Sequence, residues 1–175
     1  FFAACAAEAA GEAFAAALIS GELEEMLDVF DHRHGLGDAD NAGTAEFLLD
    51  ADTGKFKRQW GAYGKPPSDD KQPPYDPKGP PPQQFANPVH CVKLANDGLL
   101  YVCDRINNRI QVFRKDGTFV KEWFYEKNTL GNGAVWDIAI WPDPKQTWLL
   151  SADGENNEIR VLRRDDGTVV GSFGR

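Results

Sequence analysis

The sequence predicts an all-β fold made of four-stranded antiparallel sheets, chiefly because it contains an internal repeat. Residues 85–130 and 131–175 carry the same pattern of apolar runs and turns, with an offset of 46 to 50 residues. Each copy contains four short runs rich in Val, Ile, Leu, Phe, Tyr and Trp. Alternating apolar residues between turn formers are typical of strands. A repeat of this length is a supersecondary unit, so it defines the architecture before any single residue is interpreted.

The four runs of each copy are expected to be consecutive strands. They cover residues 88–94, 99–104, 109–113 and 118–120 in the first copy, and residues 135–140, 148–153, 158–162 and 168–170 in the second. Asp97-Gly98 and Asp116-Gly117 are strong hairpin signals, because glycine accepts a positive φ at little steric cost. One such sheet cannot bury both of its faces, so stacked sheets should cover one another, as the blades of a propeller do.

The first copy resembles an NHL repeat, a unit of β-propellers. The matching residues are Phe85, Pro88, Asp97, Gly98, Tyr101, Val102, Asp104, Asn107, Arg109, Ile110, Gln111, Val112, Phe113, Asp116, Gly117 and Phe119. The second copy resembles a weaker NHL repeat, with Glu158 at the position of Arg109. Residues 45–62 resemble the outer two strands of a third blade. The resemblance covers residues 45–62 and 83–175 and implies about 2.5 blades, whereas such propellers close with about six.

An incomplete ring would expose strand edges and apolar blade faces. We therefore expect the chain to be a fragment of a longer propeller, with closure by oligomerisation as the alternative. In either case, neighbouring blades or self-association would cover the open edges.

Residues 1–44 are predicted to be an Ala-rich helical segment. Alanine has the highest helix propensity, and it dominates residues 1–20. A second helix is indicated by apolar residues at i, i+3, i+4 and i+7, namely Leu23, Met26, Leu27 and Phe30. Ser20 can cap its start and Gly35 can end it. We interpret His32 and His34 as cations at the helix end rather than as a metal-binding pair.

Residues 63–84 are predicted to be a proline-rich loop or linker between blades. Eight prolines lie between Gly64 and Gln84, and proline lacks the amide donor that a strand needs. Pro74 and Pro77 have the spacing of a PxxP ligand, but a semi-rigid linker is the favoured interpretation.

The net charge of −8 favours neither nucleic acid nor an anionic membrane surface as a partner, because both require clustered Lys or Arg. No stretch is long and apolar enough to span a membrane. The expected partner is a protein, peptide or glycan on one propeller face.

His90 is the main candidate for site chemistry. It lies eight residues before Gly98, which resembles the position of a zinc-binding histidine in peptidyl-amidoglycolate lyases, themselves NHL-type propellers. The resemblance implies that His90 faces the central channel as one metal ligand. The next copy has Trp136 at the equivalent position, and Glu155 stands where that family has its catalytic tyrosine. Because zinc needs ~3–4 protein ligands, the others would have to come from further blades. The alternative is a polar residue lining the channel.

Cys91 and Cys103 lie at matching distances on either side of the Asp97-Gly98 turn, so they should be cross-strand neighbours. A disulfide is one interpretation, and two buried free thiols are the favoured one. The cellular compartment stays open, although an extracytoplasmic location is compatible with the sequence.

Asp104 and Asp153 recur at the end of the second strand of each copy, with Asn at the third and fourth following positions. Calcium binding through carboxylate and amide oxygens is one interpretation. An Asx-type turn is favoured, since recurrence in each blade indicates a structural role.

The sequence favours a binding scaffold without a complete catalytic site. No nucleophile triad, phosphate-binding loop or catalytic carboxylate pair is recognised, and no cofactor is evident. The alternative is part of a metal-dependent lyase or hydrolase propeller with His90 as one ligand, in which a full-length parent would bind zinc or calcium. A third hypothesis is that the fragment has no function of its own. The copies differ at His90 and Trp136, at Arg109 and Glu158, and at Ile106 and Glu155.

Overall fold

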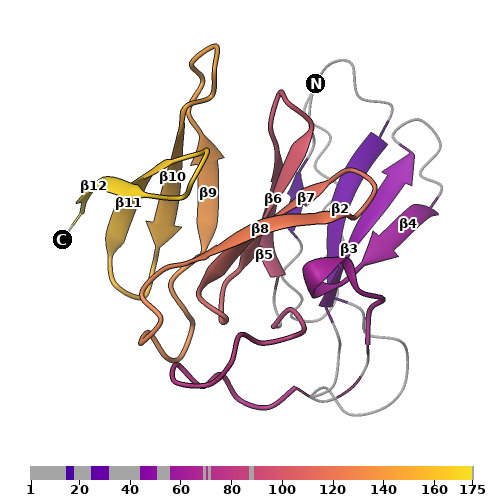
Figure 1. The fold of residues 1–175 in the computed structure, drawn as a ribbon, viewed down its shortest axis with the longest axis horizontal. Coiled ribbons are helices and arrows are strands. Elements are labelled where there is room, and N and C mark those ends of the chain that lie inside the picture. The colour runs from indigo at the N-terminus through magenta and orange to yellow at the C-terminus, as the bar shows by residue number, and fades with distance from the viewer. Residues whose placement is uncertain are drawn as a thin grey trace.

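A computed structural model describes residues 15–17, 25–31, 44–50, 56–68, 70, 72–86 and 89–174. These residues form three four-stranded antiparallel sheets, in the strand orders β1-β2-β3-β4, β5-β6-β7-β8 and β12-β11-β10-β9 (Figure 1). Within this part of the chain, the one helical element is a short 3-10 turn, η1 (Ala62–Gly64). The predicted all-β fold is confirmed. The described residues contain no helix that is long and apolar enough to cross a membrane.

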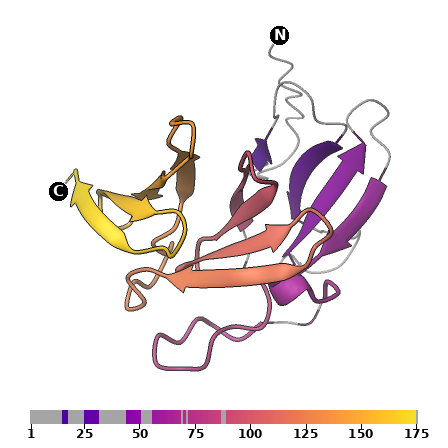
Figure 2. The same ribbon diagram turned by 45° about the horizontal axis from the view of Figure 1, so that its top comes forward.

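The strands follow one another in chain order within each sheet. They are β1 (Ala15–Ala17), β2 (Glu25–Asp31), β3 (Thr44–Asp50), β4 (Phe56–Trp60), β5 (Val89–Leu94), β6 (Leu99–Asp104), β7 (Arg109–Arg114), β8 (Phe119–Phe124), β9 (Asp137–Ile140), β10 (Trp148–Asp153), β11 (Glu158–Arg163) and β12 (Val169–Phe173). The sheets fan out side by side, with β5–β8 between the other two (Figure 2). Strand β5 contacts β1 and β2 on one side and β9 on the other. This is how the blades of a propeller are arranged.

The helices predicted for residues 1–44 are wrong wherever the structure describes that segment. Ala15–Ala17 and Glu25–Asp31 are strands, and β2 pairs along its whole length with β3. Strands β1 and β2 therefore complete the sheet to which residues 45–62 supply β3 and β4. Pairing with β3 satisfies the backbone of β2, so tertiary context overrides the local helical pattern. The remaining residues of 1–44, with His32 and His34 among them, lie outside the described residues.

The repeat extends to the details of strand pairing. In each sheet the register shifts by one residue between the third and fourth strands, at Leu48/Leu49, Val112/Phe113 and Val161/Leu162. A bulge of this kind increases the local twist of a sheet and tends to be kept within a fold. Its recurrence confirms that the partial third copy aligns with the two full ones.

Two apolar cores hold the three sheets together. One packs β4 and residue Phe85 against the first face of β5–β8, where Phe113 contacts the rings of Trp60 and Phe85 at centroid distances of 6.0 and 6.2 Å. The other packs the second face of β5–β8, including Tyr101, against Ile138 of the β9–β12 sheet. Both faces of the middle sheet are thus buried, which is the main source of stability in stacked repeats.

The outer face of the β9–β12 sheet is not covered by any described residue, and we call it the open face. It forms an apolar groove of about 580 Å³, lined by Trp141, Trp148, Leu150, Val161, Val170 and Phe173. The equivalent positions of the middle sheet, by strand register, include Tyr101 and Val112, which are fully buried against the β9–β12 sheet. The open face therefore repeats a surface that another sheet covers one blade earlier.

Candidate functional site

Four connections meet at one edge of the sheets, which we call the loop edge. They are the proline-rich connection before β5, the β6–β7 turn, the β8–β9 connection and the β10–β11 turn. Hydrogen bonds join them: Asn108 Nδ2 donates to the Thr129 carbonyl at 2.8 Å, and Asn156 Nδ2 donates to Thr129 Oγ1 at 2.9 Å. Asn108 and Asn157 both have φ of 56°, a left-handed conformation that asparagine tolerates. The loop edge is therefore a fixed surface.

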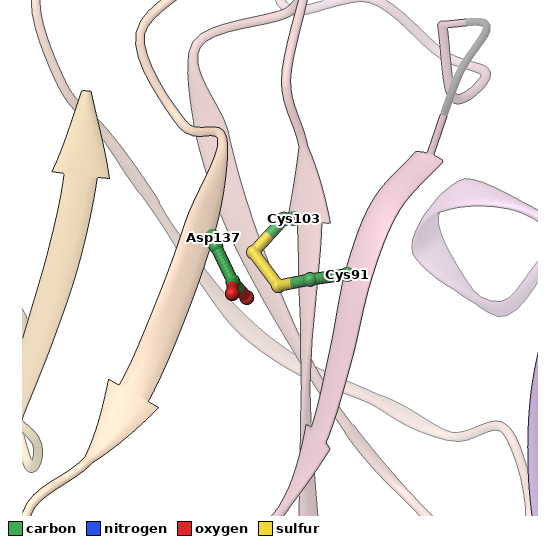
Figure 3. A group of neighbouring side chains, drawn as sticks. All are labelled: Cys91, Cys103 and Asp137. Atoms are coloured by element: carbon green, nitrogen blue, oxygen red, sulfur yellow. A yellow bond between two sulfur atoms is a disulfide. The ribbon is translucent and has the colours of Figure 1, made fainter. Parts of the chain in front are cut away.

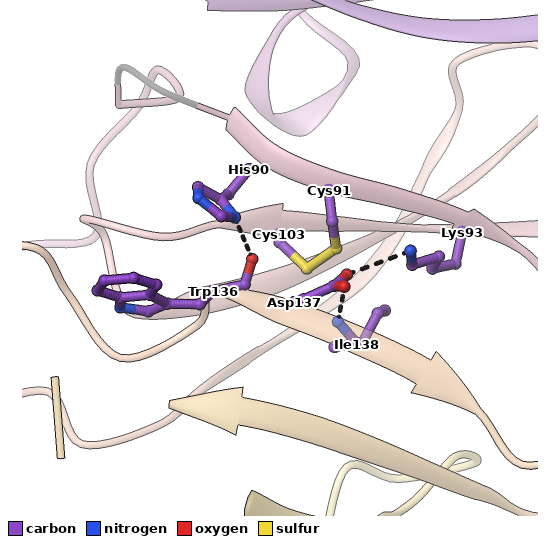
Figure 4. Close-up of a disulfide and its surroundings, with 7 residues drawn as sticks. All are labelled: His90, Cys91, Lys93, Cys103, Trp136, Asp137 and Ile138. Carbon is purple, nitrogen blue, oxygen red and sulfur yellow. Dashed lines mark hydrogen bonds and ion pairs between the residues drawn. A yellow bond between two sulfur atoms is a disulfide. The ribbon is translucent and has the colours of Figure 1, made fainter. Parts of the chain in front are cut away.

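His90 lies in β5, at a register shift between Val89 and Cys91. Its Nδ1 hydrogen-bonds the backbone carbonyl of Trp136 across the junction of the two sheets (Figure 4). Because a carbonyl can only accept, Nδ1 must carry the proton, which leaves Nε2 with a free lone pair when the ring is neutral. Burial lowers the pKa of His90, while the Trp136 carbonyl acts against that shift. The ring is therefore neutral at neutral pH.

Trp136 is half-buried at the loop edge and is held there by several contacts. Its indole Nε1 donates to the Gly133 carbonyl at 2.8 Å, and its ring centroid lies 5.8 Å from that of His90. On one side the ring lies against Gly154, where a Cβ atom would come within 2.6 Å of it. The guanidinium of Arg105 lies over the ring, 5.0 Å from its centroid. The indole is thus a rigid aromatic platform.

Arg105 belongs to the β6–β7 turn and is only half-buried. Its Nε atom is buried and has no hydrogen-bond partner. Burial lowers the pKa of Arg105, and the charge of Glu155 opposes that shift. Sequence reasoning did not single out Arg105. The available signal was the repeat itself, because the next copy has Gly154 at this position.

Cys91 and Cys103 are directly opposed in the β5–β6 register, as predicted. They form a disulfide with a Cα–Cα distance of 4.9 Å, so the favoured interpretation as two free thiols is wrong (Figure 3). The disulfide faces β9, where Asp137 accepts from the Ile138 amide at 2.8 Å and pairs with Lys93 at 3.2 Å. The first strands of two neighbouring sheets are thus linked by charge beside the disulfide (Figure 4).

Cys91, Cys103 and Asp137 form the one group of three potential metal ligands among the described residues. Both sulfur atoms are used in the disulfide, and metal binding requires thiolates, so this group cannot hold a metal in the oxidised state. His90 is not part of that group. Its proposed role as a metal ligand therefore stays a prediction.

Asp104 and Asp153 have the structural role that their recurrence predicts. Oδ1 of Asp104 accepts from the Ala86 amide at 3.0 Å, and Oδ2 accepts from Asn107 Nδ2 at 2.9 Å. Oδ1 of Asp153 accepts from the Asn156 amide at 2.9 Å. The carboxylate oxygens are thus occupied by N–H donors, which favours the turn interpretation over calcium.

Arg109 is fully buried and connects the middle sheet to the proline-rich segment. Its guanidinium donates to the carbonyls of Pro82 and Gln84 at 2.8 and 2.9 Å, and to the hydroxyl of Tyr63 at 2.8 Å. Burial raises the pKa of Tyr63 to about 12, although the charge of Arg109 opposes the rise. The segment predicted as a linker is therefore docked onto the sheet, and Arg109 contributes three of the hydrogen bonds that dock it.

Comparison with known proteins agrees with this geometry. The NHL repeat family matches residues 89–113. The match covers one repeat, and the sheets around it are arranged as blades of a β-propeller. No curated protein matches the chain.

Several solved structures share the fold. U3-55K superposes with a TM-score of 0.57 at 11% identity, over 94% of this chain and 41% of that one. A functionally unknown protein from Desulfotomaculum acetoxidans DSM 771 gives 0.56 at 13% identity, over 95% and 44%. The WD40 repeats of RRP9 give 0.56 at 10% identity, over 94% and 40%. Likeness at these identities shows the fold alone. The chain spans less than half the length of each.

Proposed function

We propose that this chain is a binding scaffold: a set of propeller blades that presents its loop edge to a protein, peptide or glycan. The observation that carries the proposal is that the buried charged side chains bind turns and loops of the chain itself. The carboxylates of Asp104 and Asp153 and the guanidinium of Arg109 are all engaged in holding turns and loops in place. Such groups build a surface rather than a reaction centre, and loops on a rigid scaffold are where binding residues concentrate.

We further propose that residues 85–130 and 131–175 act as successive blades, and that a further blade of the same kind covers the open face. This part of the proposal is supported by the match between the open face and the surface of β5–β8 that is already covered. A propeller scaffold needs its blade faces covered before the loop edge can act as one surface.

Panning a random peptide library against the immobilised protein tests the scaffold proposal. Enriched peptides are then mapped on the protein by amide hydrogen exchange. We expect protection at residues 105–108, 125–136 and 154–157, which are three of the four connections of the loop edge. A failure to enrich any peptide, or protection confined to the open face, would contradict the proposal.

A second candidate function is a metal-dependent lyase or hydrolase in which His90 is one ligand. It is favoured by one observation, the hydrogen bond from Nδ1 to the Trp136 carbonyl. Metal-binding histidines commonly donate their other ring N–H to a carbonyl, which fixes the tautomer. Isothermal titration with Zn²⁺ tests it. Binding that is lost in His90→Ala would support a metal role, and equal binding by both proteins would exclude His90 as a ligand.

A further inference from the structure

We propose that Arg105, whose guanidinium lies over the Trp136 ring at the loop edge, binds a carboxylate group of the scaffold's ligand. This inference rests on the proposed scaffold function and specifies the chemistry that the loop edge recognises. It concerns a guanidinium that contacts the indole and feels the charge of Glu155 but forms no hydrogen bond or ion pair within the described part of the chain.

The first support is that Arg105 is uncommitted, unlike the other arginines near it. Arg109 pairs with Asp104 at 2.6 Å, and Arg160 pairs with Asp153 at 2.7 Å. The guanidinium of Arg105 forms no hydrogen bond or ion pair with any described residue, and its Nε is buried without a partner. Buried donors are almost always satisfied, so an unsatisfied one indicates a missing acceptor. Burial lowers the pKa of Arg105, and the charge of Glu155 offsets only part of that shift.

The second support is that the platform beneath Arg105 is fixed before any ligand arrives. Trp136 is locked by its indole hydrogen bond to Gly133, by Gly154 on one side and by the His90 contact at its carbonyl. A guanidinium stacked on an indole keeps its hydrogen-bonding edge free for a planar partner. Such preorganisation lowers the entropic cost of binding.

The third support is that Arg105 is specific to one blade. The repeated turn residues Asp104 and Asn107 have counterparts in Asp153 and Asn156, but Arg105 corresponds to Gly154. A residue that builds every blade should recur, whereas Arg105 does not. Gly154 has a separate role, since it makes room for the indole ring on which Arg105 lies.

The surroundings favour a carboxylate over a phosphate. Glu155 acts electrostatically on Arg105. A negative charge at Glu155 repels a phosphate dianion more strongly than a carboxylate monoanion, and the whole chain carries a net charge of −8. A carboxylate also fits the fork of a guanidinium with two parallel hydrogen bonds. The ligand class is therefore a peptide that offers a C-terminal or acidic side-chain carboxylate.

NMR titration of the isotope-labelled protein with N-acetylglycine tests the inference. We expect saturable shifts of the Arg105 Nε–H and the Trp136 indole N–H, and at least a tenfold weaker affinity in Arg105→Gln. Arg114→Gln, which removes an exposed arginine elsewhere, is the matched control and should bind as the parent does. Arg105→Lys keeps the charge but loses the fork, so its affinity should fall between the two.

Three results would overturn the inference. They are equal binding by Arg105→Gln and the parent, equal shifts with the neutral N-acetylglycinamide, and shifts with methyl phosphate but not with N-acetylglycine. A well-dispersed spectrum of Arg105→Gln excludes unfolding as the cause of lost binding. If library peptides protect the loop edge but bind Arg105→Gln equally well, the scaffold proposal stands and this inference fails. If N-acetylglycine binds at Arg105 but no peptide is enriched, the scaffold proposal fails instead.

Discussion

The Nε atom of Arg109 lies 2.6 Å from Oδ2 of Asp104, and both side chains are fully buried. Removing one partner of such a buried ion pair destabilises the fold by more than the intact pair stabilises it, because the remaining charge is left buried without a partner. Arg109 also supplies the donors for the Pro82 and Gln84 carbonyls. One side chain therefore serves the turn of the blade and the docking of the proline-rich segment together.

Arg109→Leu should lower the free energy of unfolding by about 3–5 kcal/mol, because Asp104 loses its charged partner and the Pro82 and Gln84 carbonyls each lose a donor. Urea denaturation measures this change. Arg114→Leu, at an exposed position in the same strand, should change stability by less than about 0.5 kcal/mol. Burial raises the pKa of Asp104 and the charge of Arg109 opposes the rise, so without the guanidinium the folded state takes up a proton still more readily than the unfolded state. The difference in the free energy of unfolding between the parent and Arg109→Leu should therefore shrink as the pH is lowered. Equal losses in the two variants would contradict this account.

In the next blade, an arginine at a different position pairs with the repeated aspartate. Arg160 lies two positions beyond Glu158, the counterpart of Arg109, yet its Nη1 reaches Asp153 at 2.7 Å. It also pairs with Glu158 at 2.7 Å. The two sites lie on the same face of their strands because side chains alternate with a period of two. The repeated Asp thus keeps an arginine partner although the arginine itself is not at the repeated position.

The repeat made much of residues 85–175 predictable, whereas the contacts of the candidate site were not. Strand order and the opposition of Cys91 and Cys103 follow from periodicity and turn position, which are local. The docking of the proline-rich segment by Arg109 depends on a contact across 27 residues, which no local pattern encodes. Strand β2 was missed because Leu23, Met26, Leu27 and Phe30 have helical spacing, while its pairing with β3 is a tertiary interaction.

Reduction of the Cys91–Cys103 disulfide should lower the free energy of unfolding by about 3 kcal/mol, the value expected when a short loop is released in the unfolded chain. Guanidinium denaturation with and without a thiol reductant measures this change. The double variant Cys91→Ala/Cys103→Ala should not respond to the reductant. Thiol titration of the denatured, unreduced protein should find one reactive cysteine, Cys5, of the three in the sequence. Three reactive thiols would contradict the disulfide.

His90 should make stability fall as the pH is lowered below its ordinary pKa of 6.5. Burial lowers the pKa of His90 in the folded state, so the unfolded state binds the proton more readily in this window. The free energy of unfolding should therefore fall as the pH drops from 6.5 to the lowered pKa of His90 in the folded state. Below that pKa, His90 should cause no further loss. Urea denaturation across this range should give a steeper pH dependence for the parent than for His90→Gln. Equal slopes would show that the ring is not buried as described.

Gly133→Ala should destabilise the protein by more than about 3 kcal/mol, at the upper end of single substitutions. Gly133 has φ of +75°, and a Cβ atom there would lie 2.0 Å from the Arg105 carbonyl oxygen. Gly98→Ala is the matched control, because Gly98 has φ of +80° but nothing within 4 Å of the added atom. It should cost only the left-handed strain of about 1–2 kcal/mol. If thermal unfolding shows the same loss of stability for Gly133→Ala and Gly98→Ala, the backbone of Arg105 moves away from the added Cβ atom and this account is wrong.

The open face should make the isolated 175-residue chain associate with itself, because no described residue covers its apolar side chains. Trp141 and Phe173 are 49% and 58% exposed, so replacing both with serine removes apolar surface at little cost to the core. Sedimentation velocity should find association that grows with concentration for the parent and a monomer for Trp141→Ser/Phe173→Ser. Leu130→Ser, which removes an exposed apolar side chain outside the open face, should associate as the parent does. If the parent is monomeric at every concentration, the open face does not need a covering blade, and that part of the proposed scaffold is wrong.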